Sequence, residues 1–244
     1  MNAPTDLQRT PSTSRVRRQG RSPLALLATV SLALVLGVMA VVLLQGGPAQ
    51  AQQAGSASQP AAAGIVRLTF DDGPVRANTP RVLNVLSNYR VKATFFVIGQ
   101  RARRYPRLVK REYREGHSVQ NHTYTHPELT ALSPVETRRE LRATNRAIKA
   151  AGVPRPYRFR PPQGHTNARV RSVGASLGLI QTLWSVDPHD WASPPASEIC
   201  SRVVTNVRAG SIVLLHDGSG SNTVEALPCI IKKLRAQGYG FGKL

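Results

Sequence analysis

Cysteine and aromatic residues are scarce in this sequence of 244 residues, and internal repeats are absent. Two cysteines cannot build a disulfide-dense scaffold, so the fold must depend on a hydrophobic core, for which the 41% hydrophobic content suffices. An aromatic content of 5% is too low for the stacking surfaces of proteins that bind single-stranded nucleic acid. The lack of a repeat with a period of about 20 to 50 residues excludes a solenoid or a propeller.

Acidic residues are also scarce. The chain has 13 Asp and Glu against 33 Lys and Arg, which gives a formal net charge of +20. Residues 64–244 hold 28 of these basic residues and 12 of the acidic ones, a net charge of +16. Such a charge favours contact with nucleic acid, anionic lipid or an anionic cell wall, although a generally solvated basic surface explains it equally well.

The N-terminal part of the chain has the composition of a targeting segment. Residues 1–23 are basic and are expected to stay in the cytoplasm. Residues 24–44 are uncharged and apolar, and at about 1.5 Å per residue they can cross about 30 Å of hydrocarbon. This segment is either a transmembrane anchor or the hydrophobic region of a signal that is cleaved near Ala51.

Residues 45–63 lack charge and apolar periodicity, which predicts a flexible linker. The domain at 64–244 is therefore expected outside the cytoplasm, anchored or secreted, and nucleic acid becomes the least favoured partner. Both cysteines, Cys200 and Cys229, lie in this domain. In an oxidising compartment the pair predicts a disulfide, with two unpaired buried thiols as the alternative.

Segments typical of strands alternate with segments typical of helices along this domain. This alternation predicts an α/β fold with parallel strands, and about seven such units in this length favour a closed or nearly closed (β/α) barrel. Active sites of such barrels lie at the C-terminal ends of the strands. The expected strands are 65–70, 93–98, 117–121, 157–160, 179–186, 211–216 and 239–241, and the expected helices are 79–89, 105–115, 134–151, 167–177, 197–207 and 223–237.

Ionisable residues follow several of these strands. Asp71 and Asp72 end the first strand, and His122 and His126 follow the third with a spacing of four. Two histidines and one carboxylate form a set that binds a divalent metal and leaves positions open for water and substrate. Packed or surface histidines are the alternative, but the adjacent carboxylates favour metal: one binds the ion and the other accepts a proton.

Three further strand ends supply groups that suit acid and base chemistry. Arg160 follows the fourth strand and could pair with the free carboxylate and keep it ionised. Asp190 and His216 follow the fifth and sixth strands, and a histidine beside an aspartate stays protonated and oriented, as a general acid requires. Taken singly, these residues could be a surface ion pair or a turn; their joint occurrence at successive strand ends favours catalysis.

Five segments resemble, in order, the motifs of the polysaccharide deacetylase family, also called the NodB-homology or carbohydrate esterase family 4 domain. They are TFDDGP at 69–74, HTYTH at 122–126, RPPQG at 160–164, DPHDW at 187–191 and LLH at 214–216. The resemblance covers 64–244 and implies a distorted (β/α) barrel of about seven strands. It also implies one divalent metal, commonly zinc, with cobalt or another divalent ion as alternatives.

The resemblance assigns a role to each motif residue. It implies that Asp72, His122 and His126 bind the metal. It implies that Asp71 is a general base held by Arg160, and that His216 is a general acid whose partner is Asp190. It also implies that the substrate contacts are made by Gln163, Trp191 and Leu214. The family often has an aromatic residue where this chain has Gln163. The expected oxyanion contact comes from a backbone N–H, so the chemistry should survive, whereas the groove wall and the sugar preference stay open.

The expected function is a metal-dependent hydrolase that removes N-acetyl groups from a β-linked aminosugar polymer, such as peptidoglycan or a chitin-like polymer. An esterase that removes O-acetyl groups from xylan is the alternative on the same site. A non-catalytic carbohydrate-binding barrel is a third hypothesis, against which the intact metal and acid-base residues argue. The expected partners are the acetylated polysaccharide, an anionic cell wall, and the membrane through 24–44 if that segment is not cleaved.

Overall fold

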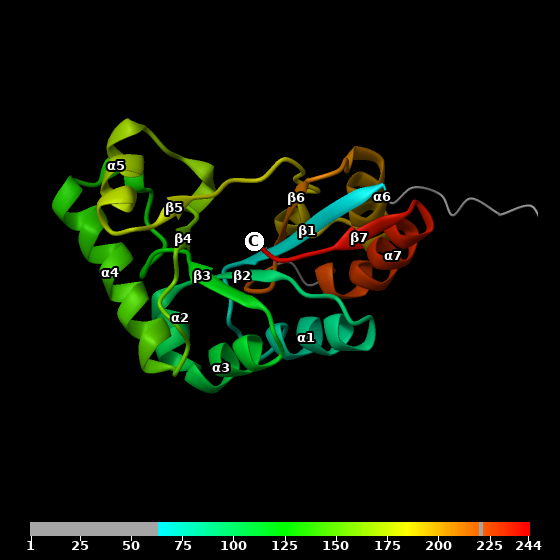
Figure 1. The fold of residues 1–244 in the computed structure, drawn as a ribbon, viewed down its shortest axis with the longest axis horizontal. Coiled ribbons are helices and arrows are strands. Elements are labelled where there is room, and N and C mark those ends of the chain that lie inside the picture. Colours follow the sequence, from blue (N-terminus) through cyan, green and yellow to red (C-terminus); the bar gives the residue numbers. More distant parts are fainter. Residues whose placement is uncertain (1–62, 220–221) are drawn as a thin grey trace, which may run out of the picture. The chain divides into compact units, whose positions relative to one another are not determined.

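The computed structural model describes residues 63–219 and 222–244 (Figure 1). The predictions for the basic N-terminus, for the apolar segment 24–44 and for the linker up to residue 62 lie outside the described residues. Within the described ranges, no helix is both long enough and apolar enough to cross a membrane. The described residues all belong to one compact unit.

Seven strands form one sheet in the order β5-β4-β3-β2-β1-β6, and β7 pairs with the beginning of β1. Every pairing within this sheet is parallel, as the alternation of strands and helices predicts. The parallel arrangement brings the C-terminal ends of the strands to one edge. The strands are β1 Gly64–Asp71, β2 Thr94–Val97, β3 Ser118–Asn121, β4 Arg158–Phe159, β5 Ile180–Gln181, β6 Ile212–His216 and β7 Tyr239–Phe241.

The sheet curls into a half-barrel, because the chain after β5 returns to β6. Val186 forms an isolated parallel bridge with Val213, and its N–H and carbonyl bond to β6. The prediction of one continuous strand over 179–186 is therefore wrong: β5 ends at Gln181, and pairing resumes only at Val186. The gap has a physical reason, since the carbonyls of Thr182 and Leu183 accept hydrogen bonds from the Arg160 guanidinium.

Helices surround the curled sheet (Figure 1). The expected helix starting at residue 134 is confirmed with its capping box, in which Ser133 and Glu136 each bond to the backbone N–H of the other. The sequence did not predict the short helix α2, whose six residues are too few for a helical period. The helices are α1 Thr79–Asn88, α2 Gly99–Arg104, α3 Pro106–Arg114, α4 Pro134–Ala150, α5 Ala168–Ser176, α6 Ala196–Asn206 and α7 Thr223–Ala236.

The hydrophobic core lies between the central strands and these helices. β1 contributes Val66, Leu68 and Phe70, which are fully buried against the aliphatic side chains of α1 and α7. Burial of this kind stabilises a fold by roughly 1.5–3 kcal/mol for each large side chain. Cys200 on α6 and Cys229 on α7 are joined by a disulfide, which ties the two helices together beside the core.

Candidate active site

Asp71 and His216 end neighbouring strands and are register partners in the sheet. Asp71 is also the register partner of Phe96, at the end of β2. This register fixes a carboxylate and an imidazole side by side at the C-terminal edge of the half-barrel. The other motif residues come from the loops that leave β1, β3, β4 and β5 at the same edge.

Asp72, His122 and His126 offer one potential metal-ligating atom each, and these atoms all lie within 4.8 Å of one another. The Nε2 atoms of His122 and His126 lie 3.4 Å and 3.1 Å from Asp72 Oδ1. His122 Nδ1 lies 2.8 Å from the carbonyl oxygen of Arg160, which fixes the tautomer with Nδ1–H as donor and leaves the Nε2 lone pair free.

The residues present fit a divalent ion. Asp72 Oδ1 is buried and has no hydrogen-bond partner in the described part of the chain, although it points at both imidazoles. Burial opposes ionisation of Asp72, but His122 and His126 outweigh it and hold the carboxyl pKa well below its usual range. An ionised oxygen with two converging imidazole nitrogens is the donor set that Zn²⁺ and similar ions bind.

The backbone at this site is held in uncommon conformations. Asp72, Thr123, His126 and Gln163 all have positive φ angles, between 58° and 70°. For residues other than glycine such angles cost free energy, and they cluster at functional sites where the surroundings hold them in place. The surrounding contacts therefore hold these loops in their conformations.

A glutamate that the sequence analysis did not single out holds the loop between the two histidines. Glu140 on α4 accepts hydrogen bonds from the backbone N–H groups of Tyr124 and Thr125, both at 2.8 Å, and from the Thr125 hydroxyl. A side-chain contact to two consecutive backbone groups leaves no periodic signal in a sequence. Glu140 thereby orients His122 and His126.

Arg160 lies inside the half-barrel with no exposed surface and donates to Asp71 Oδ1 at 2.7 Å. It also donates to Thr69 on β1 and stacks over the ring of Phe96, 4.1 Å from the ring centroid. Burial lowers the pKa of Arg160, and the Asp71 carboxylate opposes this effect. Arg160 and Asp71 thus form a buried ion pair beside the three residues of the potential metal set.

On the other side of Asp71, Asp190 holds His216. The carboxylate is fully buried; Oδ1 lies 2.7 Å from His216 Nδ1, and Oδ2 accepts from the His216 N–H and the Thr223 hydroxyl. Burial alone would lower the pKa of His216, but Asp190, helped by Asp71 and Asp72, raises it to about 9. Asp190 thereby favours the protonated form of His216, which is one of the residues that line the cavity at this edge of the sheet.

These groups surround a cavity of about 360 Å³. Gln163, Trp191 and Leu214 line it, as the resemblance implies. Trp184 and Asp187 also line it, and the sequence analysis did not assign them to the site. The DPHDW motif was a signal for Asp187, whereas nothing near Trp184 marked it. The cavity lining is therefore: Asp71, Asp72, His122, His126, Gln163, Trp184, Asp187, Trp191, Leu214 and His216.

The three histidines to which no role is assigned, His117, His165 and His189, lie outside this cavity. His117 is buried and accepts from the Ala93 N–H, and burial with nearby cations lowers its pKa to about 4. His165 lies 3.4 Å from Glu128, and His189 is half exposed at the turn that leads to Asp190. None of the three is among the residues that line the cavity.

Asp217 is a further buried acid that the sequence analysis missed. It follows His216, it is fully buried, and it accepts from the Thr79 hydroxyl. Burial raises its pKa to about 7, and the neighbouring Asp72 and Asp71 add to this effect. A β-carbon at Gly73 would collide with its carboxylate, so a glycine is required directly after the two motif aspartates.

The fold and the site together define a (β/α) half-barrel in which a potential metal-binding triad lies between an Asp–Arg pair and a His–Asp pair. The profile of the polysaccharide deacetylase family matches residues 58–181. A chitooligosaccharide deacetylase from Bradyrhizobium sp. is 43% identical over 71% of this chain and 86% of its own length. A peptidoglycan-N-acetylglucosamine deacetylase from Bacillus cereus is 41% identical over 72% of this chain and 84% of its own length.

A solved structure has the same fold. The family 4 carbohydrate esterase from Streptomyces lividans, solved with acetate, aligns with a TM-score of 0.71 and 40% identity over 75% of this chain and 93% of its own. The chain belongs to the polysaccharide deacetylase family, whose enzymes are hydrolases that remove acetyl groups. This confirms the resemblance to the family and the predicted (β/α) barrel fold, which the structure shows as a half-barrel.

Proposed function

We propose that this chain removes N-acetyl groups from an N-acetylglucosamine-containing polymer of the cell envelope. The observation that carries the proposal is the convergence of three units on one cavity: the metal triad, the Asp71–Arg160 pair and the His216–Asp190 pair. Hydrolysis of an acetamide needs a base for water and an acid for the leaving amine, and the cavity offers one of each.

Asp71 takes the proton of the attacking water, and Arg160 orients its carboxylate through a hydrogen bond of 2.7 Å. A divalent ion held by the triad would act as a Lewis acid toward the acetyl carbonyl and lower the pKa of water. The backbone N–H of Gln163, held at a φ of 58°, is the proposed donor to the oxyanion. Trp191 and Leu214 are the proposed lining for the acetyl methyl group.

His216 then gives its proton to the leaving nitrogen, since an amine anion is a poor leaving group. One amide and one water yield one acetate and one amine, and both protons are accounted for by Asp71 and His216. The esterase alternative uses the same residues. Gln163 stands where the family commonly has an aromatic residue, and it forms part of the cavity wall. Because this replacement changes the wall that meets the sugar, we retain the esterase as the alternative.

Zinc is the ion we propose, with cobalt or another divalent ion as alternatives, since an Asp-His-His set accepts several. We also propose that the domain at 64–244 acts outside the cytoplasm, tethered through 24–44 or secreted after cleavage near Ala51. The anionic cell wall is the proposed partner, in keeping with the names of the relatives and with the charge of +20.

Acetate release by the full chain tests this function. Peptidoglycan, N-acetylglucosamine oligomers and acetylated xylan are compared after exhaustive chelation and again after zinc or cobalt is added. We expect activity on the N-acetylated substrates that chelation abolishes and metal restores. Activity on acetylated xylan alone would show that the chain is an O-acetyl esterase. Full activity after the metal has been removed would overturn the proposed metal site.

Two histidine variants form a matched pair for this assay. His126→Ala should lose bound metal and activity, because two ligands hold an ion poorly. His165→Ala, which removes an imidazole outside the cavity, should change neither the bound metal nor the acetate release. Loss of metal in both variants would show that the assay reports general damage rather than ligation.

A further inference from the structure

Positive charge is unevenly distributed over the helices. The helices α2, α3 and α4 carry twelve Lys and Arg against three Glu, whereas α1, α6 and α7 carry five against two. Two of the three glutamates do little for a ligand at the surface, since Glu112 is buried and Glu140 is hydrogen-bonded to the metal-site loop. Among these helices, positive charge is therefore concentrated on α2, α3 and α4.

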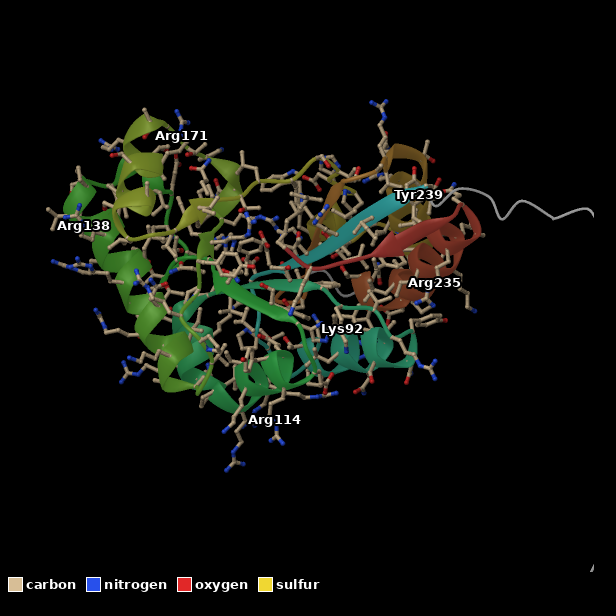
Figure 2. All side chains as sticks on the ribbon, in the orientation of Figure 1. Lys92, Arg114, Arg138, Arg171, Arg235 and Tyr239 are labelled. Atoms are coloured by element: carbon tan, nitrogen blue, oxygen red, sulfur yellow. A yellow bond between two sulfur atoms is a disulfide. The ribbon has the colours of Figure 1, made fainter. Side chains whose placement is uncertain are left out.

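Figures 1 and 2 show where these helices lie. α2, α3 and α4 are grouped beside β2 and β3, away from α6 and α7 (Figure 1). In Figure 2, Arg114 on α3 and Arg138 on α4 point outward from this group, away from the sheet. The charge thus faces solvent, where it can meet a large ligand.

A groove of about 590 Å³ crosses this basic group between α2 and α4. Arg103, Arg139 and Arg146 stand on its rim, are exposed, and form no ion pair with a carboxylate in the described part of the chain. An arginine matches a carboxylate with two parallel N–H donors, so free arginines at a rim suit a carboxylate ligand. Five of the eleven residues that line the groove are alanines, whose small side chains let a polymer approach closely: Ala102, Ala143, Ala147, Ala150 and Ala151.

The groove adjoins the proposed metal site through one residue. Tyr124 lines the groove and stands midway between His122 and His126 in the sequence. Glu140 also lines the groove, and its carboxylate holds the backbone of this loop. A ligand in the groove therefore lies against the loop that carries two of the proposed metal ligands.

We propose that this groove binds carboxylate groups of the polymer substrate and holds the strand beside the active site. The inference rests on the proposed function, and it deepens it by naming the substrate class. Among the two polymers named for the relatives, peptidoglycan carries carboxylates on its stem peptides, whereas chitooligosaccharide is neutral. Peptidoglycan therefore offers carboxylates to the three arginines, whereas chitooligosaccharide offers none.

The chemistry of the reaction adds a consequence. Each turnover converts a neutral acetamide into an amine that is protonated at neutral pH, so the polymer gains positive charge as acetate is released. The arginine groove then holds the product less tightly than the substrate, and this favours release after several turnovers.

The test is the double variant Arg139→Glu/Arg146→Glu, with Lys232→Glu/Lys233→Glu on α7 as the matched control. All four residues are exposed on helices, and the two double variants change the net charge equally. The readouts are sedimentation with insoluble peptidoglycan and the ratio of kcat/KM on soluble peptidoglycan to kcat/KM on a neutral N-acetylglucosamine oligomer. Each is repeated with peptidoglycan whose carboxylates are capped as methylamides.

We expect the groove variant to lose about tenfold in binding and in the kcat/KM ratio, the loss of at least one charge-assisted hydrogen bond. The α7 control should keep both values, and capping should remove the difference between the variants. Equal losses in both variants would overturn the groove in favour of unspecific attraction. An unchanged ratio, or a loss that persists on capped peptidoglycan, would also overturn it.

Two further measurements distinguish this proposal from a groove that binds a membrane and from a failure of the proposed function. If the groove variant instead loses binding to vesicles that contain phosphatidylglycerol and keeps peptidoglycan binding, the groove faces a membrane and the proposal is wrong. If the parent chain releases no acetate from any polymer, the proposed function fails. The sedimentation comparison still decides whether the groove binds carboxylates, so the two failures are distinguishable.

Discussion

Asp71 and His216 sit side by side at the ends of β1 and β6, but each is held by a buried group of opposite charge from a different part of the chain. On one side, the Arg160 cation reaches through the barrel interior to a carboxylate. On the other side, the Asp190 anion fixes an imidazole. Arg160 and Asp190 are both completely buried, while His216 keeps 12% of its side chain exposed.

This difference shows how one small cavity can hold a base and an acid at the same pH. A cation beside a carboxylate favours the unprotonated form, and an anion beside an imidazole favours the protonated form. The buried partner thus decides whether the group accepts a proton, as proposed for Asp71, or donates one, as proposed for His216. The roles assigned to the two sides are predictions, and variants of the four residues can break or sharpen the comparison.

Removal of the base should have the largest effect. Asp71→Asn keeps the shape of the side chain but cannot accept a proton, so turnover should fall by about 10² to 10⁴ on every acetylated substrate. The bound metal should remain, because Asp71 is not among the proposed ligands. Acetate release and metal content are measured together; loss of the metal in this variant would move Asp71 into the metal site.

Removal of the acid should be selective. His216→Ala should slow an N-acetylglucosamine oligomer far more than an activated aryl acetate, because a phenolate leaves without a proton. The measurement is kcat/KM on both substrates in the same preparation. Equal losses on the amide and on the ester would assign His216 to substrate positioning rather than to proton transfer.

The partner of the base should matter for stability as well as for rate. Arg160→Met leaves Asp71 buried without its cation, and breaking a buried ion pair costs about 3–5 kcal/mol of the free energy of unfolding. The double variant Asp71→Asn/Arg160→Met removes both charges and should recover part of this loss. Denaturant unfolding of the three variants measures the coupling; a double variant no more stable than Arg160→Met would argue against a charge effect.

The partner of the acid should shift a pH profile. The pKa of His216 is raised to about 9, so the acid form is present below that value and is lost as the pH rises through it. A divalent cation beside Asp71 and Asp72 cancels part of their contribution, which places the alkaline limb of turnover between the ordinary value of 6.5 and about 9.

Asp190→Asn removes the carboxylate that raises this pKa, so the alkaline limb should move toward 6.5 while the acidic limb stays in place. The His216–Asp190 pair also contributes to the free energy of unfolding. This contribution is fully present below pH 6.5 and is lost as the pH rises through about 9. A pH profile of kcat from pH 5 to 10 checks the shift. An unmoved alkaline limb would assign it to a group other than His216.

Much of this protein was readable in the sequence because the chemistry is local. Asp71 and Asp72 are adjacent, and His122 and His126 are four residues apart, so a few residues suffice to suggest a metal set. The alternation of strands and helices then implies that the motif loops meet at one edge of a parallel sheet. The structure confirms that fold, while the predictions for residues 1–62 stay predictions.

Only the tertiary structure decided which distant residues support these motifs. Glu140 reaches backbone N–H groups from another element, and Trp184 meets the cavity only because the chain breaks its pairing between β5 and Val186. Such contacts depend on where two segments cross in space and leave no period or motif in the chain. The same holds for the basic groove: the sequence determines the number of arginines, but the packing of α2 against α4 decides that Arg103, Arg139 and Arg146 surround one groove.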